Sequence, residues 1–264
     1  MTNRIDQLFT TKQDKVLSVY FTAGFPLIDD TITTIRSLQD GGCDMIEIGI
    51  PFSDPLADGP VIQHSSSIAL QNGMTLEKLL EQLADIRKTI SIPLILMGYL
   101  NPIMQYGLEK FCREAEAIGI DGLIIPDLPP DVYEKEYQLM FKKHKLHHIM
   151  LVTPRTTEAR IKEIERLGDG FLYAVATSST TGSSAPDTQA QSSYFKRLQH
   201  MQLRLPVIAG FGISNKEQFE QVCQFVQGGI IGSAFIKYIN KNRDLKTSIP
   251  SFIQSILYDH PTSH

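Results

Sequence analysis

Short apolar runs alternate with longer amphipathic stretches along the chain, and the alternation repeats eight times. We expect the apolar runs to be strands: Val16 to Phe21, Met45 to Ile48, Leu94 to Tyr99, Leu123 to Ile125, Ile149 to Val152, Phe171 to Val175, Val207 to Ala209 and Ile230 to Ile231. The stretches between them show helical spacing, as in Leu76, Leu79, Leu80, Leu83 and Ile86, which form one apolar stripe along a helix. The sequence therefore predicts successive strand-then-helix units.

Several of these runs are apolar at every position, which is typical of parallel strands covered by helices on both faces. Eight such units in about 250 residues favour an α/β fold of the closed (β/α)8 type, the TIM barrel. A doubly wound open sheet gives similar local signals, and periodicity does not distinguish the two. No Pro-, Gly- or Ser-rich linker divides the sequence, so we expect residues 1–264 to form one domain with an extra N-terminal helix.

Composition and charge restrict the class of partner. The chain is 42% hydrophobic, with a net charge of −4 and no block of Lys and Arg, so the electrostatic footprint of a nucleic-acid-binding protein is missing. The N-terminus lacks a signal-peptide core and no long apolar run is present, which predicts a cytoplasmic protein that does not enter a membrane. Cys43, Cys112 and Cys223 are odd in number and widely separated, as expected of reduced thiols rather than disulfides or a zinc site.

Two long loops interrupt the rhythm, Ile50 to Pro60 after the second predicted strand and Ala176 to Ala190 after the sixth. Long loops in compact domains are usually functional lids or disordered segments. In a TIM barrel the active site lies at the carboxyl ends of the strands. Polar residues at these strand ends are therefore the first candidates for a functional site.

Glu47 lies in the run Met45 to Gly49, which is too apolar for a surface strand. If Ile46 and Ile48 face the helices, alternation along the strand directs Glu47 into the barrel, where loss of water raises a carboxyl pKa toward neutrality. Such a group can both donate and accept a proton. A structural Glu paired with an interior Lys or Tyr is the alternative, and the residues alone leave it open.

The loop that follows, residues 51–60, holds three prolines and two aspartates. Proline fixes φ, so this loop can hold Asp58 in a defined place. Asx turns at Ser53 and Asp54 and a helix cap beyond them are a simpler explanation. A hard cation bound by Glu47, Asp54 and Asp58 is a weaker hypothesis, because no His lies at metal-ligand spacing, and we expect no metal.

The stretch EIGIPFSDPLADGP, from Glu47 to Pro60, resembles the signature of the tryptophan synthase α subunit family. Further similarity runs through Asn101-Pro102, Pro126-Asp127-Leu128-Pro129, Gly210-Phe211-Gly212-Ile213-Ser214 and Gly232-Ser233-Ala234. The resemblance implies a TIM-barrel lyase that cleaves indole-3-glycerol phosphate to indole and glyceraldehyde 3-phosphate. It implies that Glu47 is the principal acid and base, that Asp58 stabilises positive charge on the indole nitrogen, and that Tyr173 lies near Glu47 as a third catalytic residue.

Both ends of this substrate have candidate residues. Glycine-containing loops after the seventh and eighth predicted strands are typical of TIM-barrel phosphate sites, although tight turns explain the same glycines. The resemblance implies the phosphate-binding residues Gly182, Gly212, Gly232 and Ser233. It implies an indole pocket made of Tyr20, Thr22, Met97, Ile124, Phe211 and Ile230, each of which would also suit ordinary barrel core.

The loop after the sixth predicted strand departs from the family pattern. Relatives carry a Gly-Val-Thr-Gly core, and this chain has Ser179-Thr180-Thr181-Gly182. Thr181 and Gly182 are retained, which fits a lid whose Thr meets the Asp58 loop on closure, while the lost glycine restricts the backbone. A merely flexible Ser/Thr loop is the alternative.

The resemblance also implies a partner. The family works as an α2β2 heterotetramer in which the β subunit carries pyridoxal phosphate and receives indole, so no cofactor is expected in this chain. The residues implied at that interface are Asp54, Pro55, Asn101, Pro102 and Asp127, although turn chemistry explains them too.

Two other functions fit parts of the pattern. An aldolase of the Schiff-base type needs an interior Lys at a strand end, and none of the predicted strands supplies one. The second alternative is a noncatalytic barrel that only activates the β subunit. The retention of Glu47 and Asp58 argues against this function, whereas the altered lid sequence keeps it as an alternative.

Overall fold

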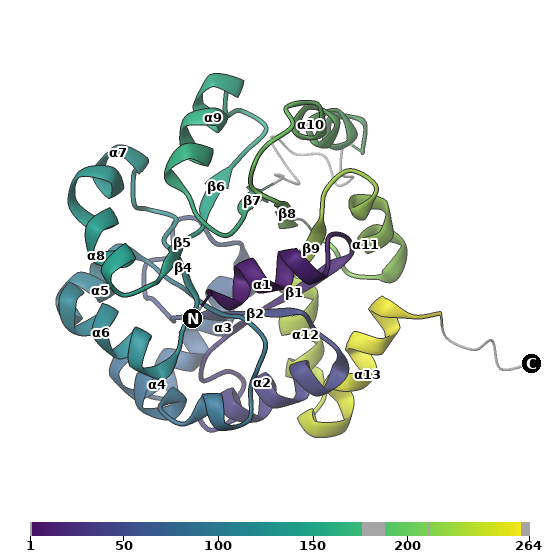
Figure 1. The fold of residues 1–264 in the computed structure, drawn as a ribbon. Coiled ribbons are helices and arrows are strands. Elements are labelled where there is room, and N and C mark those ends of the chain that lie inside the picture. The colour runs from purple at the N-terminus through teal and green to yellow at the C-terminus, as the bar shows by residue number, and fades with distance from the viewer. Residues whose placement is uncertain (1, 176–187, 211, 260–264) are drawn as a thin grey trace, which may run out of the picture.

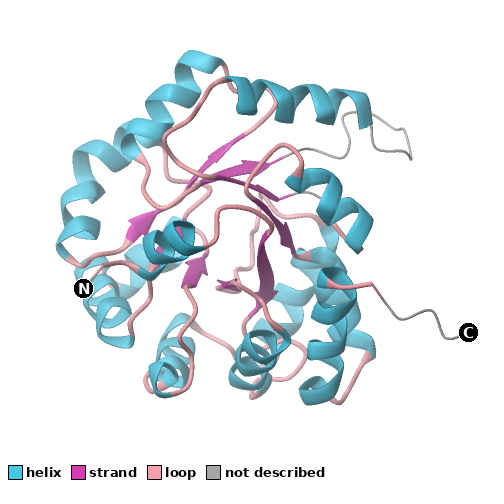
Figure 2. Cartoon of the chain, turned by 45° about the vertical axis from the view of Figure 1, so that its right-hand side comes forward, coloured by secondary structure: helices cyan, strands magenta, loops and turns pink. Residues whose placement is uncertain are grey.

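Nine parallel strands form the centre of the structure, and helices surround them (Figures 1 and 2). The computed structural model describes residues 2–175, 188–210 and 212–259. The strands are β1 (Val16–Thr22), β2 (Met45–Gly49), β3 (Leu94–Met97), β4 (Gly122–Ile124), β5 (His147–His148), β6 (Met150–Val152), β7 (Leu172–Val175), β8 (Val207–Gly210) and β9 (Gly228–Ile231). Their order is β5-β4-β3-β2-β1-β9-β8-β7-β6, and every pair is parallel, which confirms the predicted TIM barrel.

The barrel meets itself at residues 147–152, where the sequence predicts one strand, from Ile149 to Val152, and the structure has a second short strand, β5, just before it. In this segment β5 pairs with β4, and β6 pairs with β7 on the other side. Between them, the Ile149 N–H donates a 3.0 Å hydrogen bond to the Leu123 carbonyl. The segment thus changes pairing partner at Ile149, and this is why nine strands stand where the sequence predicts eight.

The helices follow the strands in the predicted alternation. They are α1 (Arg4–Thr11), α2 (Asp30–Gly41), α3 (Pro60–Gln71), α4 (Leu76–Leu83), α5 (Leu100–Tyr106), α6 (Leu108–Ile118), α7 (Pro130–Val132), α8 (Gln138–Lys143), α9 (Glu158–Leu167), α10 (Thr188–His200), α11 (Lys216–Cys223), α12 (Ser233–Lys241) and α13 (Leu245–Leu257), with a 3-10 turn η1 (Ile86–Lys88) and a π-helical turn η2 (Tyr133–Tyr137). The apolar stripe predicted on α4 and η1 is buried along its whole length. No helix of the described ranges is long and apolar enough to span a bilayer.

Helix α1 lies across the amino-terminal end of the barrel (Figure 1). Ile5 is completely buried there and lies close to Gly122 at the start of β4 and to Gly170 before β7. Arg4 adds an ion pair of 2.9 Å to the buried carboxylate of Asp121. The N-terminal helix therefore covers the end of the barrel opposite the carboxyl ends of the strands.

Alternation along the strands separates the barrel interior from the helix layer. Gly229 of β9 lies against the side chain of Phe219 on α11, so the next residue, Ile230, faces the interior. Ile230 is paired with Ser18 of β1. The inward face of β1 therefore carries Ser18 and Tyr20, and it continues with Thr22.

Candidate active site

Glu47 of β2 lies at the same register as Tyr20 and is completely buried in the barrel interior. The Ser18 hydroxyl donates a hydrogen bond of 2.8 Å to Glu47 Oε1, and Oε2 has no hydrogen-bond partner among the described residues. Burial raises the pKa of Glu47 to about 8, against a smaller lowering by the Ser18 hydrogen bond. Below this pKa the carboxyl holds a proton, which it can give up to a basic carbon and take back.

Two tyrosines face this carboxyl. Tyr20 comes from the neighbouring strand β1, and Tyr173 comes from β7, which is not adjacent to β2 and so reaches the site across the interior. Burial, together with the negative charges of Glu47 and Asp58, raises the pKa of both hydroxyls. Both phenols therefore stay neutral while Glu47 titrates.

Two glycines make room for these rings. A Cβ atom at Gly49 would overlap the hydroxyl of Tyr20, and one at Gly210 would overlap the ring and hydroxyl of Tyr173. Gly49 follows Ile48 at the end of β2, and Gly210 ends β8. The missing side chains at these strand ends are thus what allows two large aromatic residues to enter the interior.

Tyr99 holds the loop that carries Asp58. Its hydroxyl accepts a 2.9 Å hydrogen bond from the Ala57 N–H and donates one of 3.2 Å to Asp58 Oδ2. Its ring packs on Phe52 at a centroid distance of 5.2 Å. Gln63 Nε2, from α3, donates to the Asp58 carbonyl at 2.8 Å. Prolines, an aromatic contact and three hydrogen bonds therefore hold this loop at the ends of the strands.

The two carboxyls have different environments. Asp58 is half-buried, and burial raises its pKa to about 6, against a lowering by the Tyr99 hydrogen bond. Glu47, which lies deeper, reaches about 8. A site with one carboxyl ionised and the other protonated near neutral pH can divide acid and electrostatic roles between them.

Four of the predicted indole-pocket residues lie on strands around this pair. Gly49 of β2 pairs in register with Thr22 of β1 on one side and with Met97 of β3 on the other, and Met97 pairs with Ile124 of β4. These residues therefore form one layer of the barrel interior at the ends of the strands. Thr22 Oγ1 lies 2.7 Å from the Ser65 hydroxyl of α3, and Ile230 lies deeper in the interior, in register with Ser18. Tyr20 is described above, and Phe211 lies outside the described residues.

The predicted phosphate residues lie at the ends of β8 and β9. Gly212 has a φ of +33°, and no heavy atom comes within 4 Å of where its Cβ would be. Gly232 precedes α12 and has no side chain that could cap it. The first N–H groups of this helix, which begin at Ser233, have no helix carbonyl to bind and form its positive end. Gly182 and the predicted lid residue Thr181 lie outside the described residues.

Comparison with known proteins agrees with this geometry. The family model described as tryptophan synthase alpha chain matches residues 7–255. The chain is 52% identical to the tryptophan synthase alpha chain of Flavobacterium psychrophilum over 254 residues, which covers 96% of this chain and 99% of the relative. The corresponding protein of Phocaeicola vulgatus is 52% identical over 239 residues, 90% of this chain and 93% of the relative.

This chain belongs to the tryptophan synthase alpha chain family. The fold agrees as well. A crystal structure of tryptophan synthase subunit alpha from Legionella pneumophila superimposes with a TM-score of 0.87 at 34% identity and covers 97% of each chain. A structure of Mycobacterium tuberculosis tryptophan synthase gives a TM-score of 0.85 at 28% identity and covers 98% of this chain and 100% of the other. The family resemblance predicted from the sequence is thereby confirmed.

The five residues that this family membership suggests for a partner interface gather around Tyr99 and Leu100. The Asp127 carboxylate accepts hydrogen bonds of 2.9 and 3.2 Å from the Leu100 N–H, at the start of α5. Asn101 and Pro102 follow in the same helix, and Asp54 and Pro55 belong to the loop that Tyr99 holds. Asp54, Asn101 and Asp127 are exposed, so this rim is accessible in the isolated chain.

Two residues of the site were not predicted from the sequence. Ser18 bonds Glu47, and Tyr99 bonds Asp58. The run VLSVYFT places polar side chains at every second position of an otherwise apolar strand, a signal that could have identified Ser18. Tyr99 offers no comparable signal, because an aromatic residue at a strand end is ordinary core.

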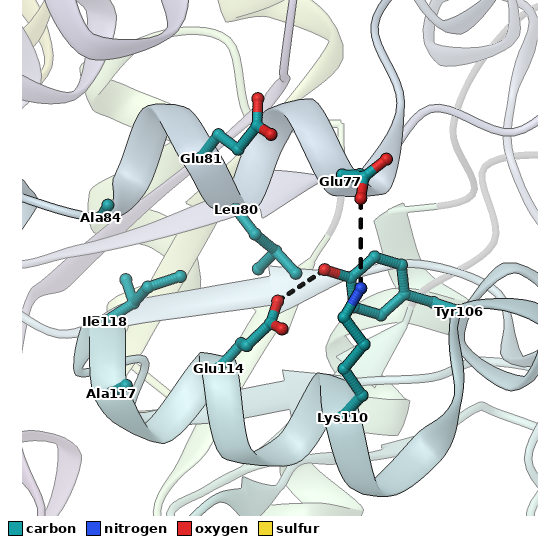
Figure 3. A pocket seen from close by; sticks show the side chains of 9 residues that line it. All are labelled: Glu77, Leu80, Glu81, Ala84, Tyr106, Lys110, Glu114, Ala117 and Ile118. Carbon is teal, nitrogen blue, oxygen red and sulfur yellow. Dashed lines mark hydrogen bonds and ion pairs between the residues drawn. The ribbon is translucent and has the colours of Figure 1, made fainter.

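A cavity of about 380 Å³ lies between α4 and α6, away from the strand ends (Figure 3). Four of its polar groups form two pairs: the Tyr106 hydroxyl donates to Glu114 Oε2 at 2.5 Å, and Lys110 Nζ lies 4.0 Å from Glu77 Oε1. The predicted site residues do not line it. Within the described part of the chain, no group of three or more His, Cys, Asp or Glu residues could hold a metal ion.

Proposed function

We propose that this chain catalyses the α reaction of tryptophan biosynthesis, the retro-aldol cleavage of indole-3-glycerol phosphate to indole and glyceraldehyde 3-phosphate. Membership of the tryptophan synthase alpha chain family supports the reaction. The observation that carries our assignment of the chemistry is the buried carboxyl of Glu47, whose raised pKa keeps it protonated near neutral pH and whose Oε2 is free of partners among the described residues.

The reaction needs a group that acts first as an acid and then as a base. Indole leaves poorly as a carbanion, so the ring carbon that bears the side chain must first be protonated. Glu47 supplies this proton, and its carboxylate then takes a proton from the hydroxyl on the adjacent side-chain carbon. The carbon–carbon bond breaks, its electrons restore the indole ring, and an aldehyde forms. Glu47 regains its proton, so the cycle closes without a cofactor in this chain.

Asp58 acts on the charge that develops during the first step. Protonation of the ring carbon places positive charge on the indole nitrogen, and an ionised carboxylate held near the N–H stabilises it. Tyr99 and the Ala57 N–H fix the loop in which Asp58 lies, so the carboxylate needs little reorganisation. Tyr173, on the far side of Glu47, orients the substrate or the carboxyl through its neutral hydroxyl.

The two ends of the substrate bind to different parts of the barrel. We assign the indole to Tyr20, Thr22, Met97, Ile124 and Ile230, and the family resemblance adds Phe211 to this set. We assign the phosphate to backbone N–H groups at Gly212, Gly232 and Ser233, where the positive end of α12 favours an anion, and to Gly182.

We also propose that the chain works with a tryptophan synthase β subunit in an α2β2 complex and passes indole to it. Pyridoxal phosphate belongs to that partner. Asp54, Pro55, Asn101, Pro102 and Asp127 form the docking rim, and its position beside Tyr99 gives a route from partner contact to the Asp58 loop. Binding of the β subunit is therefore expected to raise the rate of cleavage.

The test is release of indole from indole-3-glycerol phosphate by the purified protein, alone and with a β subunit. Glu47→Gln keeps the shape of the side chain and removes its acid–base chemistry, so we expect a loss of at least about 100-fold in kcat with the fold intact. Gln39→Ala, which removes hydrogen bonds to Thr89 and Ser91 ahead of β3 and touches no residue of the site, is the control. Turnover retained by Glu47→Gln would refute the assignment, and a rate unchanged by the β subunit would refute the coupling.

A further inference from the structure

Ser18 is a polar residue in an apolar layer of the barrel. It is completely buried on β1, and its register partners on the two neighbouring strands are Met45 and Ile230. A hydroxyl in such surroundings costs free energy unless it forms a hydrogen bond. The bond that it forms is the one of 2.8 Å to Glu47 Oε1.

The position of Ser18 defines how Glu47 is held. Glu47 pairs in register with Tyr20, and Ser18 lies one interior layer closer to the amino-terminal end of β1. The hydrogen bond therefore holds Oε1 on the side of the amino-terminal end of the barrel. The other oxygen, Oε2, has no partner among the described residues. A serine hydroxyl can donate to Oε1 whether Oε2 carries a proton or not, so the bond survives both states of the carboxyl.

We propose that Ser18 is a positioning residue for the cleavage, which fixes Glu47 through Oε1 so that Oε2 carries the proton in both transfers. The proposal rests on the function proposed for Glu47 and adds to it an oxygen-specific role. Without Ser18 the two oxygens become equivalent and the carboxyl can rotate, so fewer encounters place a proton donor against the ring carbon.

The same bond gives a readout that a purely structural serine would not affect. The hydrogen bond favours the carboxylate, so its loss raises the pKa of Glu47 further. The titratable groups whose charge interacts with that of Glu47 are Tyr20 from β1, Tyr173 from β7 and the thiol of Cys43 before β2, and burial raises the pKa of all three. Both tyrosines titrate far above the pH range of the assay, and Asp58 titrates near 6. A loss of activity at alkaline pH therefore reports the titration of Glu47.

The experiment measures kcat and KM for indole release across pH 5 to 10 in wild type, Ser18→Ala, Ser18→Thr and Ser37→Ala. Ser37 is a buried serine of α2 remote from the site and controls for loss of a buried hydroxyl. For Ser18→Ala we expect kcat to fall about ten- to hundred-fold, KM to change little, and the alkaline limb of kcat to move upward. Ser18→Thr keeps a hydroxyl at this position, so we expect the alkaline limb of kcat to stay at the wild-type pH. We expect Ser37→Ala to have the kcat and the alkaline limb of the wild type.

Other outcomes overturn the proposal. If Ser18→Ala keeps the wild-type kcat and the wild-type alkaline limb, the reaction does not need the hydroxyl. If kcat falls while the alkaline limb stays in place and Ser18→Thr does not restore kcat, the substitution has disturbed only packing. If Ser18→Ala does not fold, Ser18→Cys keeps the volume with a weaker donor and is judged by the same criteria. Glu47→Gln separates the two claims, because activity in that variant defeats the proposed function itself, whereas an inactive Glu47→Gln beside a normal Ser18→Ala defeats only the role of Ser18.

Discussion

At the scale of single residues, burial acts unequally on the two carboxyl groups and predicts the pH dependence of the reaction. Glu47 must start protonated, so activity is present below its pKa of about 8 and is lost as pH rises through it. Asp58 must be ionised, so activity is present above its pKa of about 6 and is lost as pH falls through it. We expect a bell-shaped profile of kcat/KM with these two limbs, measured by indole release. Asp58→Asn should lose the acid limb and keep the alkaline one, and a wild-type profile flat from pH 5 to 9 would contradict both roles.

How much of the site could be read from the sequence also depends on single residues. The inward direction of Glu47 followed from Ile46 and Ile48, because alternation is a local property of a strand. The bond from Ser18 could not be read in the same way, since it depends on the register between β1 and β2. Tyr99 likewise reaches the Asp58 loop through the fold, and no local pattern marks it.

At the scale of elements, β7 and β8 meet where Tyr173 lies over Gly210, and this contact can be tested. Gly210→Ala forces a methyl group against the ring of Tyr173, so we expect a loss of about 1–3 kcal/mol in the free energy of unfolding and displacement of Tyr173. Urea denaturation measures the stability, and indole release measures the effect on the site. Gly59→Ala is the control, because its φ is −76° and no atom lies within 4 Å of the new methyl group. In the Tyr173→Ala background Gly210→Ala should cost little further stability, because the ring that its methyl group meets is absent. Equal losses in both single glycine variants would contradict the contact.

The sequence predicted the strands and helices of the barrel better than the way in which the barrel closes. The eight alternations gave the strands and helices because burial on both faces of a strand and on one face of a helix leaves a local signal. Closure of the barrel at Ile149 leaves no such local signal, since it depends on which strands become neighbours where β5 and β6 meet. The division into β5 and β6 and the location of α1 over the barrel floor therefore came only from the structure.

At the scale of the whole molecule, the two ends of the barrel have separate tasks. The carboxyl end carries Glu47, Asp58 and the loops, and the amino end carries α1 and the ion pairs of Asp121 with Arg4 and Arg87. Asp121 also accepts a hydrogen bond of 2.9 Å from the Leu94 N–H, so it links α1 and η1 to the start of β3. The buried carboxylate of Asp121 thus joins three elements at the amino end of the barrel, apart from the carboxyl end where the site lies.

The stability of the whole molecule in acid is expected to depend on His148 of β5. Its ring is buried against Tyr133 and Phe141, at centroid distances of 4.2 and 5.7 Å, and neither ring nitrogen has a hydrogen-bond partner among the described residues. Burial lowers the pKa of His148 to about 3, whereas an unfolded chain binds this proton near 6.5. The neutral ring therefore contributes fully above pH 6.5, and its contribution is lost as pH falls toward 3, by about 1.4 kcal/mol per pH unit.

His148→Phe keeps an aromatic ring in this cluster and removes the titration. Urea unfolding at pH 7.5 and 4.5 should show that wild type loses about 2–3 kcal/mol more than the variant over this interval, with the other acid-sensitive groups cancelling in the comparison. His200→Gln, at an exposed position, should follow wild type. Neither ring nitrogen of His148 has a hydrogen-bond partner among the described residues, so a proton on this ring is unpaired in the folded state and favours unfolding. Parallel pH curves for wild type and His148→Phe would mean that the folded and unfolded states bind this proton equally well, and that acid unfolding depends on other groups.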